Sequence, residues 1–218
     1  METTPPFGLH QSPTERKHPP VTAATDHKVT VVLTRPLVLV GLMGAGKTSV
    51  GKRLAAILNV PFRDSDHEIE AAAGLEVREI FERFGEPYFR DGEARVIRRL
   101  LADAPGILAT GGGAFMSEPL RQEIARSACS VWLDAELDTL WQRVKDRPTR
   151  PLLQQPEPRK VLAALLESRA PVYAGADVRV RSEPGLSHEQ MARRILEGVR
   201  AHDLAHPGRP PALEKKTG

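Results

Sequence analysis

The sequence contains a single cysteine, Cys129, which excludes a disulfide framework and a zinc site built from cysteines. Aromatic residues make up only 5% of its 218 residues. No apolar run approaches the roughly 18 residues that a membrane-spanning helix needs, so we expect no membrane partner. The seven histidines lie mostly towards the two ends and show no metal-ligand spacing.

Charge of one sign is not in excess either. The 31 lysines and arginines are nearly balanced by 28 acidic residues, which gives a formal net charge of +3. This is too weak a basic character to indicate nucleic-acid binding. The N-terminus also lacks a basic segment followed by an apolar one, so we expect no secretory signal. These features predict a cytoplasmic protein whose partners are small molecules.

Both ends of the chain are rich in proline and polar residues and show little apolar periodicity. Such segments bury too little apolar surface to offset the entropy lost on ordering. We therefore expect residues 1–35 and 202–218 to be disordered. A single folded domain is predicted between them, over residues 36–201.

Within this domain, short apolar runs alternate with amphipathic helical patterns. A continuous apolar run is typical of a parallel strand that is buried on both faces. Alternating strands and helices predict a three-layer α/β fold with a parallel sheet between helices. The predicted strands lie at residues 37–40, 60–62, 106–109, 131–133 and 177–180.

The segment from Gly41 to Thr48, GLMGAGKT, matches the phosphate-binding pattern G-x-x-x-x-G-K-[ST]. Its glycines let backbone N–H groups face phosphate oxygens, and the following helix adds the positive end of its dipole. Lys47 is predicted to reach the β- and γ-phosphates, and the hydroxyl of Thr48 to bind Mg²⁺. The residues expected to bind nucleotide here are Gly44, Ala45, Gly46, Lys47, Thr48 and Ser49.

Two carboxylates, Asp64 and Asp66, follow the second predicted strand. In an extended segment, side chains at i and i+2 point to the same side, so both are expected at the nucleotide. One carboxylate can hold a metal shell and the other can orient an attacking hydroxyl. The alternative is a solvated turn in which an aspartate caps a helix starting near His67.

Three consecutive glycines, Gly111 to Gly113, follow the third strand and suggest that a ligand approaches the backbone closely. The alternative is a flexible turn. Arg169 falls on the inward apolar stripe of its helix, and Arg90 lies next to Phe89 at the predicted start of another long helix. Both arginines can grip a carboxylate through paired hydrogen bonds, or can form internal salt bridges instead.

The proline-rich segment of residues 146–159 connects two predicted helices and contains Arg150. Long connections inside compact domains are often lids, although a plain linker is the alternative. In a closed lid, Arg150 is predicted to neutralise charge on a transferred phosphoryl group and to exclude water.

Taken in order, these segments resemble the shikimate kinase family from about residue 36 to residue 196. The matching stretches are GLMGAGKT, DSDHEIE, IFERFGEPYFRDGE, LATGGGAF, RPLL and SRAPVY. The resemblance implies a P-loop fold of the nucleoside-monophosphate-kinase type, with a five-stranded parallel sheet and a mobile lid. It also implies a monomer that transfers the γ-phosphate of ATP to the 3-hydroxyl of shikimate, with Mg²⁺ as cofactor, in aromatic amino acid biosynthesis.

The same resemblance implies roles for individual residues. Asp64 would hold the magnesium shell, and Asp66 would bind substrate hydroxyls and act as the base. Arg90 and Arg169 would bind the shikimate carboxylate. Arg150 would be the lid arginine. The remaining implied contacts are Arg143 on adenine and, around the substrate ring, Phe81, Phe89, Gly111, Gly112 and Gly113.

Two other functions fit part of the sequence. Another small P-loop kinase, acting on gluconate or a nucleoside monophosphate, would share the phosphate loop. The candidate carboxylate-binding pair, Arg90 and Arg169, favours an acid over a nucleoside. A non-catalytic nucleotide-binding regulator would also share the loop, but the complete set of Lys47, Thr48, Asp64 and Asp66 disfavours it.

Overall fold

The computed structural model describes residues 29–146 and 156–217. Its centre is the expected five-stranded parallel sheet, with strand order β3-β4-β2-β5-β6. The central strand β2 is buried at all of its positions, in agreement with its uniformly apolar sequence. The five strands are β2 (Leu37–Val40), β3 (Phe62–Asp64), β4 (Ile107–Ala109), β5 (Cys129–Ala135) and β6 (Val178–Ser182).

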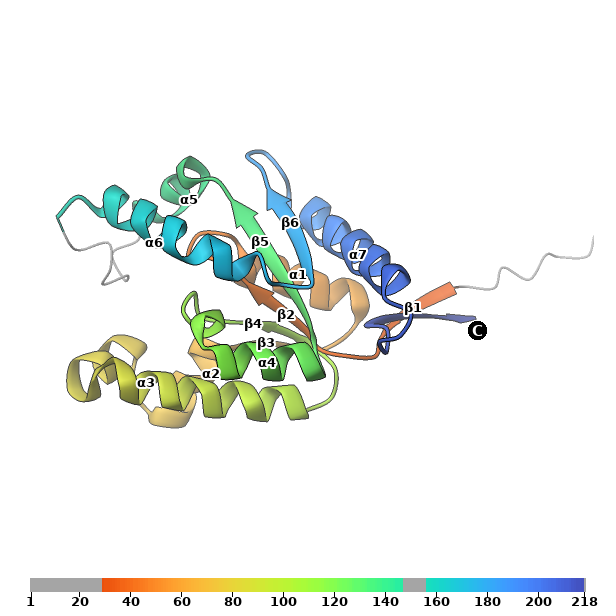
Figure 1. The fold of residues 1–218 in the computed structure, drawn as a ribbon, viewed down its shortest axis with the longest axis horizontal. Coiled ribbons are helices and arrows are strands. Elements are labelled where there is room, and N and C mark those ends of the chain that lie inside the picture. The colour runs from red at the N-terminus through yellow and green to blue at the C-terminus, as the bar shows by residue number, and fades with distance from the viewer. Residues whose placement is uncertain (1–28, 147–155, 218) are drawn as a thin grey trace, which may run out of the picture.

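Helices cover both faces of this sheet, which gives the predicted three layers. In Figure 1, α3 (Val77–Ala102) and α4 (Glu118–Ser127) lie on one side of the sheet. On the other side, α1 (Lys47–Leu58) packs against α7 (His188–Ala205). The remaining helices are α2 (Ser65–Ala73), the short 3₁₀ helix η1 (Ala114–Met116), α5 (Leu137–Val144) and α6 (Pro158–Tyr173). Within the two described ranges, no helix is long and apolar enough to cross a membrane.

Helices α2 and α3 carry a small apolar cluster of their own, separate from the main core. Its buried members are Ile69, Ile80 and Phe89, with Phe81 partly buried against them. Helix α3 is kinked at Gly85, whose φ of 79° is not helical. Because Phe89 is anchored in this cluster, the position of its neighbour Arg90 is fixed as well.

The register of the sheet brings three loops to one edge. Ala109 at the end of β4 is level with Asp64 of β3 and with Leu39 of β2. The segments that follow these strands are the phosphate loop, the acidic pair and the glycine cluster. Ligands of open α/β sheets bind at the carboxyl ends of the strands, so this edge is the expected site.

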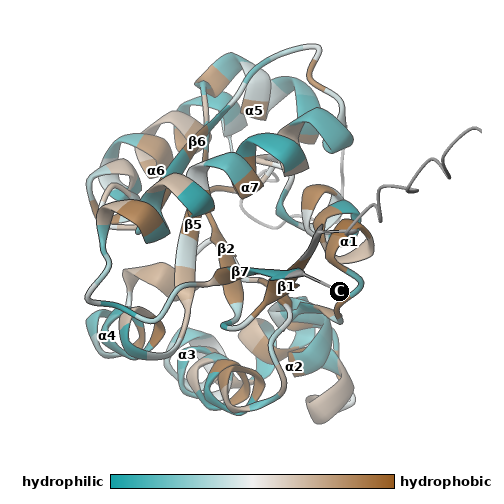
Figure 2. Cartoon of the chain, turned by 90° about the vertical axis from the view of Figure 1, so that its right-hand side faces the viewer, coloured by the Kyte–Doolittle hydropathy of each residue, from teal (hydrophilic) through white to brown (hydrophobic). Residues whose placement is uncertain are grey.

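The prediction that both ends are disordered was wrong for the described residues 29–35 and 202–217. Strand β1 (Val29–Leu33) pairs antiparallel with β7 (Leu213–Thr217), and α7 continues to Ala205. This terminal ribbon, β1 with β7, is held because Leu33, Ala212 and Leu213 are buried in the core. The two paired strands lie near opposite ends of the sequence, so no local sequence pattern predicts that they pair. Figure 2 shows β7 as mostly hydrophilic, next to its pairing partner β1. Residues 1–28 lie outside the described part.

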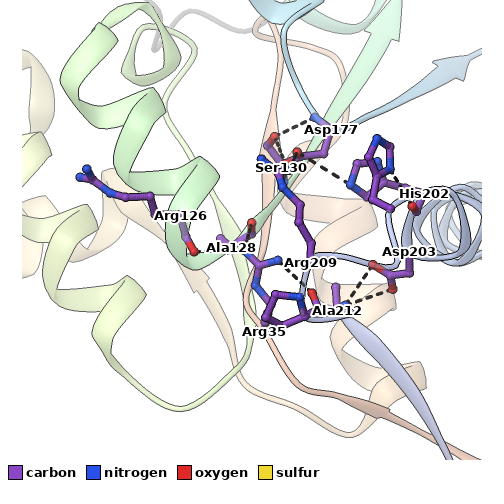
Figure 3. A network of polar contacts seen from close by, with 11 residues as sticks. Arg35, Arg126, Ala128, Ser130, Asp177, His202, Asp203, Arg209 and Ala212 are labelled. Atoms are coloured by element: carbon purple, nitrogen blue, oxygen red, sulfur yellow. Dashed lines mark hydrogen bonds and ion pairs between the residues drawn. The ribbon is translucent and has the colours of Figure 1, made fainter.

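A polar network fastens the C-terminal segment to the sheet (Figure 3). The carboxylate of Asp203 accepts hydrogen bonds from the N–H groups of Ala212 and Leu213. The Arg35 guanidinium donates to the carbonyls of Pro210, at 3.1 Å, and Ala128, at 2.8 Å. These bonds satisfy backbone groups that have no partner in the main sheet.

Asp177 is a largely buried carboxylate of this network, with its side chain 12% exposed. It accepts hydrogen bonds from the amide and hydroxyl of Ser130 at 2.8 and 2.7 Å, and it pairs with Arg209 at 2.9 Å. Burial raises the pKa of Asp177, but the Ser130 hydrogen bonds, His202 and Arg209 together outweigh burial and lower it. Its contribution to stability is therefore present above the unfolded-state pKa and is lost as the pH falls through the folded-state pKa.

We expect Asp177→Ala to lower the free energy of unfolding by about 2 kcal/mol at neutral pH, because hydrogen bonds to a charged group are lost. The difference from the wild type should shrink as the pH falls through the acid range. Urea unfolding between acid and neutral pH measures both effects. Asp138→Ala, which removes an exposed partner of Arg159, is the control and should change little. A pH-independent difference would contradict the assignment.

Candidate active site

The phosphate loop lies between β2 and α1, as predicted. Gly46 is the N-cap of α1 and has a φ of 98°, a conformation that side-chain-bearing residues rarely adopt. The first N–H groups of α1 have no partners within the helix and lie at its positive end. The loop therefore presents an anion-binding site of the predicted kind.

Lys47 and Thr48 open the helix at this site. The Lys47 Nζ donates to the carbonyl oxygens of Gly41 at 2.7 Å and Leu42 at 3.1 Å, which keeps the ammonium over the loop. The hydroxyl of Thr48 donates to the Asp64 Oδ2 at 2.8 Å. The structure thus brings Asp64, from the next strand of the chain, to the end of the phosphate loop, where α1 begins.

A cavity of about 380 Å³ opens beside the loop. Its walls include residues 44–50 of the loop and helix, together with Arg143, Ser182, Leu186 and Met191. The Arg143 Nη1 donates to the Gly44 carbonyl at 3.1 Å and to the Ser182 hydroxyl at 3.0 Å. Burial lowers the pKa of Arg143. Its guanidinium is therefore tethered at the cavity wall, where a nucleotide base can stack on it. The role of Ser182 was not foreseen from the sequence.

The acidic pair differs from the extended arrangement that was predicted. Asp64 is the N-cap of α2 and accepts a hydrogen bond from the Asp66 N–H at 3.2 Å, so Asp66 lies in the first helical turn. The capping alternative was therefore right for Asp64, although the helix starts at Ser65 rather than near His67. The two carboxylates consequently have different neighbours, since Asp64 reaches Thr48 and Asp66 reaches the glycine cluster.

The glycine cluster forms a turn of residues 111–113, called the triglycine turn, against which several charged side chains converge. A Cβ atom on Gly111 would lie 2.7 Å from both Asp66 Oδ1 and Glu93 Oε1. One on Gly113 would lie 2.4 Å from the guanidinium of Arg90. The Ser65 hydroxyl accepts the Gly111 N–H at 3.0 Å, which fixes the turn. This turn is therefore an ordered part of the site, and side chains on it would displace the charged groups.

Arg90 is half-buried and pairs with Glu93 at 2.7 Å and with Glu86 at 3.1 Å. Its guanidinium carbon lies 5.2 Å from the Phe89 ring centroid and 6.0 Å from that of Phe81, within cation–π range. Arg90 therefore forms the internal salt bridge that the sequence left open as an alternative. Its partner Glu93 lies at the triglycine turn as well, so the pair is part of the candidate site.

Glu93 was also not predicted from the sequence as a site residue. It is only 2% exposed, and its Oε1 has no hydrogen-bond partner in the described part of the chain. Burial raises the pKa of Glu93, Arg90 opposes this, and the nearby Asp66 carboxylate adds to it. A buried oxygen without a partner, aimed at the triglycine turn, indicates a polar ligand there. The signal was available, since Glu93 interrupts an apolar stripe that includes Phe89 and Ile97.

Arg169 lies where the sequence placed it, on α6 and facing the sheet edge. It is half-buried, and its Nη1 donates to the Gly112 carbonyl at 3.0 Å. The hydroxyl of Tyr173, one helical turn later, donates to the same oxygen. Arg90 and Arg169 therefore meet the triglycine turn at adjacent residues, Gly113 and Gly112. Arg150 and most of the predicted lid lie in residues 147–155, outside the described residues.

We expect Gly113→Ala to weaken binding of an acidic acceptor. The new methyl group would meet the end of the flexible Arg90 side chain, which must move away from Glu93. The KM of the acceptor should rise about tenfold, which corresponds to the loss of about one charge-assisted hydrogen bond, and the KM of ATP should stay unchanged. Gly92→Ala, a site with open space on the same helix as Arg90, is the control. An unchanged acceptor KM in Gly113→Ala would contradict the assigned contact.

A phosphate loop, a cavity beside it and a cluster of charged side chains around the triglycine turn, all at one sheet edge, define an ATP-dependent kinase of the P-loop class. The family model for shikimate kinase matches residues 43–200. The chain is 56% identical to the shikimate kinase of Cereibacter sphaeroides over 167 aligned residues. The aligned region covers 77% of this chain and 83% of that protein. The chain belongs to the shikimate kinase family.

Solved structures agree with this assignment. Shikimate kinase from Acinetobacter baumannii, in complex with shikimate, is 37% identical and superposes with a TM-score of 0.74, covering 78% of this chain and 95% of that one. A gluconokinase from Sinorhizobium meliloti 1021 is only 18% identical, with a TM-score of 0.53 over 82% of this chain and 99% of that one. That likeness shows a shared fold and nothing of the acceptor.

Proposed function

We propose that the protein transfers the γ-phosphoryl group of ATP to the 3-hydroxyl of shikimate, which yields shikimate 3-phosphate and ADP in aromatic amino acid biosynthesis. The convergence of Asp66, Arg90 and Arg169 on the triglycine turn, beside the phosphate loop, carries the proposal. Family membership supports it, as does the related A. baumannii structure that contains shikimate.

In this proposal the two arginines bind the acceptor carboxylate. Arg90 and Arg169 approach from α3 and α6, so a carboxylate between them would receive hydrogen bonds from two directions. Glu93 acts as a positioning residue, because its salt bridge sets the direction of the Arg90 guanidinium. The walls of the ring pocket are Phe81, Phe89 and the turn residues Gly111, Gly112 and Gly113.

The nucleotide occupies the phosphate loop and the adjoining cavity. N–H groups at the start of α1 bind its phosphates, Lys47 reaches the β- and γ-phosphates, and Arg143 stacks on adenine. The residues proposed to contact the phosphates are Gly44, Ala45, Gly46, Lys47, Thr48 and Ser49.

Thr48 and Asp64 are the proposed protein partners of Mg²⁺. Their side-chain oxygens meet at 2.8 Å beside the loop, and hard oxygen donors of this kind suit Mg²⁺, which takes most of its remaining ligands from water and phosphate. When bound, Mg²⁺ neutralises charge on the β- and γ-phosphate oxygens. The described residues contain no group of three or more His, Cys, Asp and Glu side chains that could hold a metal ion by themselves.

Asp66 is the proposed base. Its carboxylate accepts the proton of the 3-hydroxyl as the hydroxyl oxygen forms a bond to the γ-phosphorus and the bond to ADP breaks. Lys47 stabilises the charge that spreads over the transferred group, and Arg150 is proposed to do so from the lid. The triglycine turn keeps Asp66 and the arginines around one acceptor, so the hydroxyl is oriented before reaction.

A coupled assay of ADP release with shikimate, gluconate and CMP tests the proposal. We expect turnover with shikimate only. Turnover with gluconate or CMP instead would overturn the acceptor assignment, and tight ATP binding without turnover on any acceptor would favour a nucleotide-binding regulator. We also propose that the protein is a monomer, because the proposed site needs no residue from a second chain; size-exclusion chromatography with light scattering tests the oligomeric state. A cytoplasmic location remains our prediction from the sequence.

A further inference from the structure

We propose that Tyr173 is a positioning residue for the acceptor site, which acts by holding the Gly112 carbonyl to which Arg169 also donates. This inference rests on the proposed function, because it assigns Tyr173 to the binding of an acidic acceptor. Tyr173 does not contact the reacting atoms in this view. It fixes the backbone on which one of the two carboxylate-binding arginines is oriented.

The hydrogen-bond geometry is the first support. Tyr173 is the last residue of α6, one turn after Arg169, so both side chains leave the same face of the helix. The Tyr173 hydroxyl and the Arg169 Nη1 both donate to the carbonyl oxygen of Gly112. A carbonyl oxygen has two lone pairs, and these two donors therefore set its direction.

The surroundings of Tyr173 hold its hydroxyl in place. The side chain is 1% exposed, and its ring lies 6.0 Å from Trp132 and 6.4 Å from Phe115, stacked with both. A phenol enclosed in this way has no room to turn towards another acceptor. Burial raises the pKa of Tyr173 to about 12, so the hydroxyl stays a neutral donor at physiological pH.

Gly112 also lies against the phosphate loop. A Cβ atom on Gly112 would be 3.6 Å from the Gly41 carbonyl oxygen and 3.7 Å from the Met43 nitrogen. Tyr173 therefore holds the residue at which the triglycine turn meets the loop. Loss of its hydroxyl should let the Gly112 carbonyl tilt and should loosen Arg169, while the nucleotide contacts of Lys47 and Thr48 remain.

The test is Tyr173→Phe, which keeps the ring and removes only the hydroxyl. We expect the KM of shikimate to rise about tenfold and the KM of ATP to change less than twofold, because only the acceptor side loses a hydrogen bond. Ser130→Ala removes another buried hydroxyl far from the site and is the matched control; it should lower stability without changing either KM. An unchanged shikimate KM in folded Tyr173→Phe, or an equal rise in both KM values, would overturn the proposal.

A double-mutant cycle with Arg169→Ala separates positioning from general damage. If Tyr173 acts through Arg169, Tyr173→Phe should raise the shikimate KM far less in the Arg169→Ala background than in the wild type. Fully additive effects would overturn the proposal.

If Tyr173→Phe does not fold, a variant with 3,5-difluorotyrosine at position 173 is used for the same KM measurement instead. This residue keeps the ring and hydroxyl but ionises at lower pH, so the shikimate KM should rise at the pH where the donor is lost. A flat KM profile through that ionisation would count against the proposal. A wild type that used another acid instead of shikimate would refute the proposed function, and the same KM comparison with that acid would still decide the role of Tyr173.

Discussion

Asp66→Asn is expected to lower kcat by about a thousandfold, within the range that removal of a general base produces. The amide keeps the size and the polar contacts of the side chain but cannot accept the proton of the acceptor hydroxyl. Because Asp66 lies beside Gly111 and Glu93 rather than on the phosphate loop, ATP affinity should hardly change. Steady-state kinetics with saturating shikimate measure kcat, and titration with an ATP analogue measures nucleotide binding.

Asp91→Asn is the matched control for this variant. Asp91 lies on α3, one residue after Arg90, but its side chain is 68% exposed and pairs with the exposed Arg95. Its replacement should leave kcat unchanged. Wild-type turnover in Asp66→Asn would refute the assigned base, and a collapse of ATP affinity would place Asp66 on the nucleotide instead.

Arg169→Ala is expected to raise the KM of shikimate about a hundredfold, as the loss of a paired, charge-assisted contact to a carboxylate should cost nearly 3 kcal/mol. Fold and nucleotide binding should survive, because the Gly112 carbonyl keeps its bond from Tyr173. Arg169→Lys should be intermediate, since an ammonium keeps the charge but not the planar pair of donors. The measurement is the KM of each substrate at saturating levels of the other.

Arg78→Ala serves as the control for the lost charge, since Arg78 is exposed and pairs with Glu82 one turn along α3. It should leave both KM values unchanged. If Arg169→Ala raised the KM of ATP and spared that of shikimate, the arginine would belong to the nucleotide site.

Local patterns in the sequence sufficed for the sheet and for the phosphate loop. The strands are short apolar runs, and the loop is a contiguous motif whose geometry follows from its glycines. The conformation of Asp66 was predicted wrongly, because a capping carboxylate at Asp64 starts a helix at once where an extended segment was expected. The Asp64 carboxylate also accepts a hydrogen bond from Thr48, a contact with another element that no local pattern shows.

Residues whose importance comes from burial were harder to find. Arg169 was predicted because a charge on an apolar stripe demands a partner. Glu93 carries the same signal on α3, and its role became clear only with its position beside Gly111. The terminal ribbon was missed for a different reason, since the pairing of β1 with β7 joins segments from opposite ends of the chain.

The terminal ribbon also determines where the chain can be cut and rejoined. Val29 is the register partner of Thr217, so a short linker would span the two positions once residues 1–28 were removed. New ends could then be opened at the exposed turn that contains Asp103 and Ala104, between α3 and β4, which lies away from the carboxyl ends of the strands. A circularly permuted enzyme built in this way should keep the wild-type arrangement of its catalytic edge, because the junction lies at the end of the sheet from which β2 starts (Figure 1).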